Sequence, residues 1–185
     1  MTLDPLNAAT SIIACIGLPG SGKSTIGRQL AKRLDIRFFD SDYVIERRIG
    51  CSIRNFFERD GEQAFRYLDQ DVIAELTQNR GCVLSTGGGV VLRPVNREKL
   101  HQRCQVVYLH SAPDEVFRRL RHDQNRPLLR VADPLARLKE LYDLRDPLYR
   151  ETAHFVVETK RPSGSTLVNM IVTQLELAGV IAAQG

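Results

Sequence analysis

The sequence lacks the features that mark membrane and secreted proteins. It contains no tryptophan, and aromatic residues make up only 6% of its 185 residues. No apolar run approaches the roughly 20 residues that a membrane-spanning helix needs. The first residues lack a basic start followed by an apolar segment, so no secretory signal is predicted. We therefore expect a cytoplasmic protein with no membrane partner.

Cysteine is also sparse, and its spacing argues against a zinc site. The chain contains no C-x-x-C pair, and no group of Cys and His residues has zinc spacing. Two of the four cysteines, Cys15 and Cys82, fall in expected buried strands, where cysteine packs as a small apolar residue. The others, Cys51 and Cys104, stand far apart. The pattern fits a reducing compartment.

The charge balance is compatible with two kinds of partner. The net charge is +4 at pH 7, and the isoelectric point is about 9.0. Positive charge attracts nucleic acid, but it serves equally well in a site for small anions. The Lys and Arg residues form no long run, only doublets such as Arg47-Arg48. We therefore expect an anionic small-molecule substrate and no nucleic-acid partner.

Residues 17–24 read G-L-P-G-S-G-K-S and match the phosphate-binding P-loop, G-x-x-x-x-G-K-[ST]. An apolar run precedes the motif and helical spacing follows it, as a P-loop requires. The glycines let backbone N–H groups point at an anion, while Lys23 can reach the outer phosphates and Ser24 can hold Mg²⁺. The alternative is a glycine-rich turn with an incidental lysine. The P-loop predicts that ATP and Mg²⁺ are bound, with nucleotide contacts from Gly20, Ser21, Gly22, Lys23, Ser24 and Thr25.

Apolar runs alternate with amphipathic stretches, which predicts an α/β fold. We expect a P-loop three-layer α/β/α sandwich with a central five-stranded parallel sheet, a helical insertion and a lid. The strands are expected at residues 12–16, 37–39, 82–85, 106–109 and 155–158. The helices are expected at residues 23–34, 42–49, 61–78, 97–102, 114–121, 134–142 and 167–177.

The chain length suits a single domain, within which three segments stand apart from the sheet and its helices. Residues 1–10 resemble a loose leader without a motif. Residues 41–70 are predicted to form a helical insertion between the second and third strands. Residues 122–134, which include Arg126, are polar and contain proline, so they are predicted to form a mobile lid over phosphates. The alternative for this last segment is an ordinary surface connection.

Two carboxylates, Asp40 and Asp42, follow the second expected strand. If that strand continues to Asp42, both side chains share one face, because strand side chains alternate. Ligands of open α/β sheets bind at the carboxyl ends of the strands. One carboxylate would then help to organise Mg²⁺, and the other would bind or activate a hydroxyl. The alternative is that Asp42 caps the helix that follows.

Glycine and arginine residues supply the remaining candidates. Residues 87–89 are three glycines after the third expected strand, where exposed backbone N–H groups could admit a substrate, although a flexible turn is the alternative. Arginine binds a carboxylate or phosphate through two parallel hydrogen bonds. Spacing alone does not separate Arg66, Arg126 and Arg145 from the other arginines of the chain.

Taken together, these motifs resemble those of the shikimate kinase family, in order along nearly the whole chain. The resemblance rests on residues 17–28, D-x-D at 40–42, G-E-x-x-F-R at 61–66, G-G-G at 87–89, R-P-L-L at 126–129 and R-D-P-L-Y at 145–149. It implies a nucleoside-monophosphate-kinase-like fold with a small substrate-binding insertion, here residues 41–70, and a lid, here residues 122–134. It also implies transfer of the γ-phosphoryl group of Mg-ATP to the 3-hydroxyl of shikimate, a step in aromatic amino-acid biosynthesis.

The resemblance further implies roles for the candidate residues. Asp42 would hold substrate hydroxyls and is the candidate to take the proton, while Asp40 would support the metal site with Ser24. The substrate contacts would come from Asp42, Arg66, Gly87, Gly88, Gly89 and Arg145, with both arginines on the carboxylate. The catalytic residues would be Lys23, Asp42 and Arg126, the last reaching the phosphates from the lid. The adenine contacts near residues 160–162 stay unassigned, and a monomer is expected.

The sequence leaves three alternative functions to consider. A gluconate kinase of the same fold would also bind a carboxylated polyol, although residues 87–89 and 145–149 together favour shikimate. A nucleoside monophosphate kinase would not carry the D-x-D and G-E-x-x-F-R patterns. A nucleotide switch or a nucleic-acid-binding ATPase would turn over ATP without a small acceptor and would bind in a steeply salt-dependent way.

Overall fold

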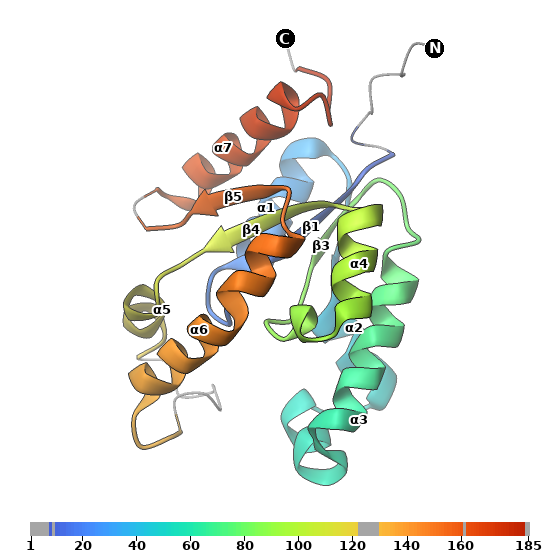
Figure 1. Ribbon diagram of the computed structural model, residues 1–185. Coiled ribbons are helices and arrows are strands. Elements are labelled where there is room, and N and C mark those ends of the chain that lie inside the picture. Colours follow the sequence, from blue (N-terminus) through green and yellow to red (C-terminus); the bar gives the residue numbers. More distant parts are fainter. Residues whose placement is uncertain (1–7, 9, 122–129, 161, 184–185) are drawn as a thin grey trace.

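The five strands form one parallel sheet in the order β2-β3-β1-β4-β5. The computed structural model describes residues 8, 10–121, 130–160 and 162–183, and Figure 1 shows the arrangement of its elements. The expected five-stranded parallel sheet is confirmed. Its strands are β1 (Ile12–Ile16), β2 (Arg37–Asp40), β3 (Cys82–Ser85), β4 (Gln105–His110) and β5 (Phe155–Glu158).

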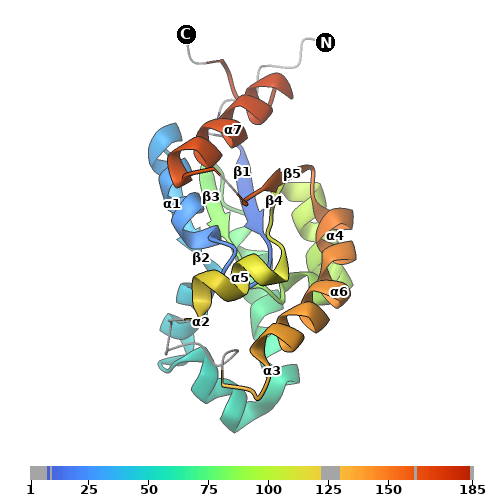
Figure 2. The same ribbon diagram turned by 90° about the vertical axis from the view of Figure 1, so that its left-hand side faces the viewer.

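Helices cover both faces of the sheet. Figure 2 shows α1 on one side of the strands and α4 and α6 on the other, so the expected three-layer sandwich is confirmed. The helices of the described part are α1 (Lys23–Leu34), α2 (Ser41–Ile49), α3 (Ile53–Leu76), α4 (Pro94–Arg103), α5 (Pro113–Leu120), α6 (Pro134–Thr152) and α7 (Gly164–Leu177), with a short 3-10 helix, η1 (Val90–Leu92).

The central strand β1 supplies both halves of the core. Successive strand side chains point to opposite faces, and every residue of β1 is buried. Ile13 and Cys15 pack with side chains from α1 and α7, whereas Ile12, Ala14 and Ile16 pack with side chains from α3, α4 and α6. A sheet covered on both faces explains why the strands are continuous apolar runs.

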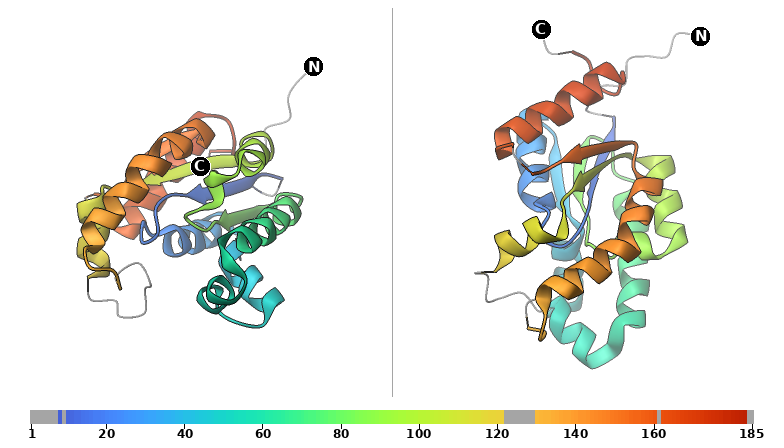
Figure 3. Two further views of the ribbon diagram at one scale, coloured as in Figure 1. Left: turned by 60° about the horizontal axis from the view of Figure 1, so that its bottom comes forward. Right: turned by 60° about the vertical axis from the view of Figure 1, so that its left-hand side comes forward.

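The carboxyl ends of the strands bring the sequence motifs to one edge of the sheet. The P-loop follows β1, Asp40 ends β2, and the three glycines at 87–89 follow β3. The expected insertion, residues 41–70, comprises α2 and the first part of α3. These two helices extend beyond the sheet in Figures 1 and 3. The fold thus gathers three motifs that lie far apart in the sequence.

The structure differs from the expected elements at three helices. Residues 53–60, where no helix was expected, belong to α3, whose N-cap Ser52 accepts a hydrogen bond from the N–H of Asn55 at 3.1 Å. The expected start at residue 61 is a kink, because Gly61 has a non-helical φ of 85°. The α6 helix runs to Thr152 instead of ending at residue 142, although it contains Pro147. The 3-10 helix η1 was not expected.

None of the helices in the described ranges is long and apolar enough to cross a membrane. Most of the expected lid, residues 122–129, lies outside the described residues, as does most of the expected leader. The described remainder of the lid, residues 130–133, leads into α6, whose N-cap is Asp133. The proposed division into leader, insertion and lid therefore stays a prediction.

Candidate functional site

The P-loop leads directly into α1, and its final glycine requires a special backbone. Gly22 caps α1 with φ 94° and ψ 16°, a left-handed conformation that side chains rarely adopt. The first-turn N–H groups of any α-helix lack intrahelical partners, so here they are available to an anion. The Nζ atom of Lys23 donates to the carbonyl oxygens of Gly17 at 2.9 Å and Leu18 at 2.8 Å. The lysine is thus held within the loop, beside the expected phosphate position.

The other predicted P-loop residues have different surroundings. Ser21 is buried, and its hydroxyl has no hydrogen-bond partner among the described residues. Gly20 lies against α5, since a β-carbon there would come within 2.6 Å of a Leu120 methyl group. Thr25 lies on the exposed side of the first turn of α1. The loop therefore needs small residues both for its shape and for its contact with α5.

Three oxygen-bearing side chains meet at the start of α1. The hydroxyl of Ser24 donates to Oδ2 of Asp40 at 2.5 Å and lies 3.2 Å from the hydroxyl of Ser85. Hard cations such as Mg²⁺ prefer oxygen ligands and keep several waters and phosphate oxygens. The predicted pair Ser24 and Asp40 therefore fits a Mg²⁺ site. Ser85 was not predicted, and its place at the end of β3 was the only signal.

The relation between Asp40 and Asp42 differs from the one expected. Strand β2 ends at Asp40, and Asp42 lies in the first turn of α2, so the shared strand face is wrong. The alternative is also wrong, because Asp40 is the N-cap of α2 and not Asp42. Oδ1 of Asp40 accepts from the N–H groups of Asp42 at 3.0 Å and Tyr43 at 3.3 Å. One carboxylate therefore binds both the helix and Ser24.

The carboxylate of Asp42 faces the glycine loop. A β-carbon at Gly87 would lie 2.8 Å from the Oδ1 atom of Asp42, so any other residue at this position would collide with the carboxylate. Burial raises the pKa of Asp42, the neighbouring Asp40 raises it further, and Lys23 opposes both. A carboxylate with a raised pKa is a better proton acceptor than an exposed one. The structure thus places Asp42 beside the loop in a state suited to accepting a proton.

The glycine loop also contacts the P-loop and Arg66. A β-carbon at Gly88 would lie 2.7 Å from Cδ of Pro19, in the P-loop, and one at Gly89 would overlap the guanidinium of Arg66. The turn is hydrogen-bonded, because the N–H groups of Val90 and Leu92 donate to the carbonyls of Gly87 and Gly89. Because residues 87–89 have no side chains, Asp42, Pro19 and Arg66 can each lie close to the backbone of the loop.

The two predicted arginines converge from different helices. Arg66 comes from α3 and Arg145 from α6. Arg145 is 9% exposed, and burial lowers its pKa, to which repulsion from the Arg66 guanidinium adds. Arg66 donates to the exposed carboxylate of Glu62 at 3.2 Å. The Nε atoms of both arginines are buried without a partner among the described residues, which is the arrangement expected of a site that receives an anion.

Asp69 is a site residue that the sequence analysis missed. It lies three residues after Arg66 on α3, is only 2% exposed, and its Oδ1 atom has no hydrogen-bond partner among the described residues. Burial raises its pKa to about 7, Asp42 contributes in the same direction, and Arg66 opposes. The signal was present in the sequence, since residues three apart on a helix are neighbours.

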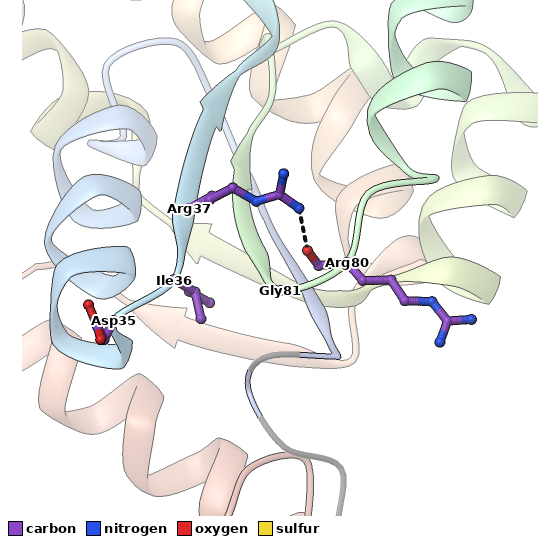
Figure 4. Close-up of a pocket in the computed structure, with 5 residues that line it drawn as sticks. All are labelled: Asp35, Ile36, Arg37, Arg80 and Gly81. Carbon is purple, nitrogen blue, oxygen red and sulfur yellow. Dashed lines mark hydrogen bonds between the residues drawn. The ribbon is translucent and has the colours of Figure 1, made fainter.

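One predicted site residue falls outside the described part of the chain, and one cavity lies away from the site. Arg126, predicted to reach the phosphates, lies outside the described residues. A cavity of about 520 Å³ opens at the opposite end of the sheet, where Arg37 donates to the carbonyl of Arg80 at 2.7 Å (Figure 4). Its lining includes none of the predicted site residues, so it is separate from the site.

The shikimate kinase family model matches residues 19–176 of the chain. The chain belongs to the shikimate kinase family. A shikimate kinase from Paracidovorax citrulli is 60% identical over 171 residues, which are 91% of this chain and 93% of that relative. One from Burkholderia thailandensis is 56% identical over 167 residues, 90% of this chain and 91% of the relative. The predicted family and the predicted function, an ATP-dependent shikimate kinase, are confirmed.

Solved structures agree with membership of the shikimate kinase family. A shikimate kinase from Acinetobacter baumannii in complex with shikimate has a TM-score of 0.87 and 43% identity, covering 92% of this chain and 95% of that one. A gluconokinase from Sinorhizobium meliloti has a TM-score of 0.56 at 16% identity, covering 94% of this chain and 95% of that one. That second likeness shows a shared fold alone, so it gives the gluconate kinase reading no support of its own.

Proposed function

We propose that this shikimate kinase family member transfers the γ-phosphoryl group of Mg-ATP to the 3-hydroxyl of shikimate, giving shikimate 3-phosphate and ADP. The observation that carries the proposal is the contact between the P-loop and the glycine loop at Pro19 and Gly88. Since Gly89 in the same loop lies against Arg66, this contact puts the cationic pair Arg66 and Arg145 near the phosphate-binding loop. A donor phosphate and an anionic acceptor would therefore bind side by side.

On the donor side, the P-loop would hold the nucleotide phosphates. Backbone N–H groups at the start of α1 supply the fixed dipoles, and Lys23 supplies a charge. In the structure this charge is bound by the carbonyls of Gly17 and Leu18. We propose that Lys23 turns from these carbonyls to the β- and γ-phosphates when ATP binds. Phosphoryl transfer depends mainly on such positioning and neutralisation of charge.

Ser24 and Asp40 would hold Mg²⁺, with Ser85 close enough to contribute a water-mediated contact. Support comes from the donor set, since all three side chains present oxygen and the Ser24 hydroxyl lies within hydrogen-bond distance of both Asp40 and Ser85. When bound, Mg²⁺ neutralises charge on the β- and γ-phosphate oxygens. Asp40 would keep its place through its hydrogen bonds to the first turn of α2.

On the acceptor side, Arg66 and Arg145 would bind the carboxylate of shikimate together with the backbone of residues 87–89. Each arginine has an Nε–H donor without a partner among the described residues, and an anion bound between the two guanidinium groups would relieve their repulsion. Asp42 would accept hydrogen bonds from the acceptor hydroxyls. Its raised pKa suits it to take the proton as the hydroxyl attacks.

Three further parts of the proposal rest mainly on the family resemblance. Arg126, outside the described residues, would bring a further charge to the transferred phosphoryl group from the lid at 122–134. Residues 41–70 would act as the substrate-binding insertion, for which the position of Arg66 in α3 gives additional support. The protein would work as a monomer in the cytoplasm.

The test is release of ADP in the presence of Mg-ATP with shikimate, gluconate, a nucleoside monophosphate or no acceptor. We expect turnover with shikimate alone. Turnover with gluconate would keep the phosphate-binding assignment and overturn the acceptor site. ADP release that does not depend on an acceptor would instead support the ATPase or switch reading.

A further inference from the structure

The buried hydroxyl of Tyr149 connects two parts of the acceptor pocket. Tyr149 lies on α6, one turn after Arg145, and its side chain is fully buried. Its hydroxyl donates to the carbonyl oxygen of Gly88. The same hydroxyl contacts the Arg145 guanidinium, an interaction that raises the guanidinium's pKa against the larger lowering effect of burial. One atom therefore touches both the glycine loop and an arginine of the pocket.

The hydrogen bond to Gly88 sets the direction of a backbone donor. A peptide unit is planar, so its C=O and N–H groups point in opposite directions across the bond. Because the Gly88 carbonyl is held by Tyr149, the N–H of Gly89 points away from Tyr149. The preceding unit is fixed too, since the Gly87 carbonyl accepts from the N–H of Val90 at 3.2 Å. Both peptide units of the loop thus have a defined orientation.

These two peptide units leave their N–H groups available to a ligand. Neither the Gly88 nor the Gly89 N–H donates to an acceptor among the described residues, whereas the Gly87 N–H donates to the Ser41 hydroxyl at 3.2 Å. Polar backbone groups at such a place normally find a partner. Two amides in a loop that lies against Arg66 and is linked through Tyr149 to Arg145 make a complement to a planar anion with two oxygens.

We propose that Tyr149 is a positioning residue for acceptor binding, because its hydroxyl locks the Gly88–Gly89 peptide unit and the Arg145 guanidinium into one arrangement that receives the acceptor carboxylate. This proposal rests on the acceptor site described under the proposed function. Tyr149 itself does not touch the acceptor. Burial raises the pKa of Tyr149 to about 12, so its hydroxyl keeps its proton and remains a donor at neutral pH.

The principal test is Tyr149→Phe, which keeps the ring and removes only the hydroxyl. We expect the KM for shikimate to rise by about 10-fold to 100-fold, as for loss of a hydrogen bond that involves a charged group. The kcat and the KM for ATP should change by less than about 3-fold, since the P-loop is untouched. A carboxamide analogue of shikimate should lose little on the same substitution, because the effect acts through the carboxylate.

Tyr108→Phe is the matched control. The Tyr108 ring packs against Tyr149 with centroids 4.9 Å apart, and its hydroxyl donates to Oδ1 of Asp146 at 2.7 Å. This control removes a buried hydroxyl bound to the same helix, but it leaves the link to Gly88 in place. We expect its KM for shikimate to stay within about 2-fold of the wild-type value. An equal rise in both variants would overturn the proposal in favour of general loosening of α6.

A measurement on the unsubstituted protein keeps the proposal testable if Tyr149→Phe folds poorly. The amide signals of Gly88 and Gly89 should move on addition of shikimate in ¹H–¹⁵N spectra, while that of Gly87 moves less. If neither amide responds at saturation, the proposal is wrong. Arg145→Ala separates the two levels of the argument. A large rise in KM for Arg145→Ala with none for Tyr149→Phe would overturn only the role of Tyr149, whereas no change in either would overturn the acceptor site itself.

Discussion

The guanidinium of Arg66 occupies the volume into which a side chain at residue 89 would project. A β-carbon built at Gly89 overlaps both terminal nitrogens and the central carbon of Arg66. Gly89 does not have a positive φ, so its backbone alone does not require glycine. The requirement comes from the neighbour on α3. One residue of the glycine loop is therefore matched to one arginine of the acceptor pocket.

This match predicts that Gly89→Ala weakens acceptor binding through Arg66. The new methyl group would push the guanidinium out of position, and a displaced charged partner reduces affinity. We expect the KM for shikimate to rise by about 10-fold or more, with a smaller change in kcat. Steady-state kinetics at saturating ATP measures both values.

A double-mutant cycle with Arg66→Ala tests the cause. Removal of the guanidinium removes the overlap, so Gly89→Ala should add little to the loss already caused by Arg66→Ala. Strictly additive losses would show that Gly89 acts independently of Arg66. Gly87→Ala is a useful comparison, because its β-carbon would meet Asp42 instead, and it should mainly lower kcat.

Lys23→Ala should nearly abolish phosphoryl transfer while leaving the fold intact. The Lys23 side chain is held by the P-loop carbonyls of Gly17 and Leu18 and lies outside both apolar core clusters, so its removal should leave the core packing in place. Loss of a preorganised charge at the transferred group lowers kcat by about 10²–10³-fold. Lys32→Ala, an exposed lysine at the end of the same helix, is the control and should retain activity. Near-normal turnover in Lys23→Ala would remove the lysine from the mechanism.

Much of the fold could be predicted because local patterns decide it. The helix at residues 23–34 and the strands at 12–16, 82–85 and 155–158 have the bounds that their apolar patterns indicate. The bounds of α3 and α6 were predicted wrongly for a different reason, which is packing against distant residues. Residues 53–60 are charged, but Phe56 and Phe57 pack against the core from outside, which a single-sequence pattern does not reveal. The α6 helix continues through Pro147 because Tyr149 and Thr152 are buried beyond it.

The site was predictable as a set of residues but not as a set of contacts. The P-loop, the carboxylates and the glycines each follow a strand, so the parallel sheet alone brings them to one edge. The reach of Asp40 to both Ser24 and the start of α2 depends on where β2 ends, which spacing leaves uncertain by one or two residues. Asp69 and Ser85 belong to no motif described for the sequence. Asp69 follows Arg66 by one helical turn, but its significance, like that of Ser85, becomes clear only from burial and from the distant neighbours Asp42 and Ser24.

Because Asp40 both caps α2 and contacts Ser24, its replacement by Asn and by Ala should affect stability differently. Asp40→Asn keeps an oxygen that can cap α2 but removes the charge, so it should raise the Mg²⁺ concentration needed for half-maximal activity without much loss of stability. Asp40→Ala removes both functions and should in addition lower the free energy of unfolding by about 0.5–2 kcal/mol. Magnesium titration of activity and urea denaturation measure the two effects. Equal stability of the variants would argue against capping by Asp40.

Asp69 should make the ligand-free protein less stable as the pH rises from about 4 to about 7. Burial raises its pKa from 3.8 to about 7, so between these values the native state holds a proton that the unfolded chain has released. At about 1.4 kcal/mol per pKa unit, the loss is at most about 4 kcal/mol, and it is complete above about pH 7. Asp69→Asn cannot titrate, so it should flatten this slope and be more stable than the wild type at pH 8. Asp71→Asn, an exposed change on the same helix, should keep the wild-type slope. Urea denaturation at pH 5 and pH 8 decides the matter, because an unchanged slope in Asp69→Asn would mean that Asp69 is already ionised at pH 5.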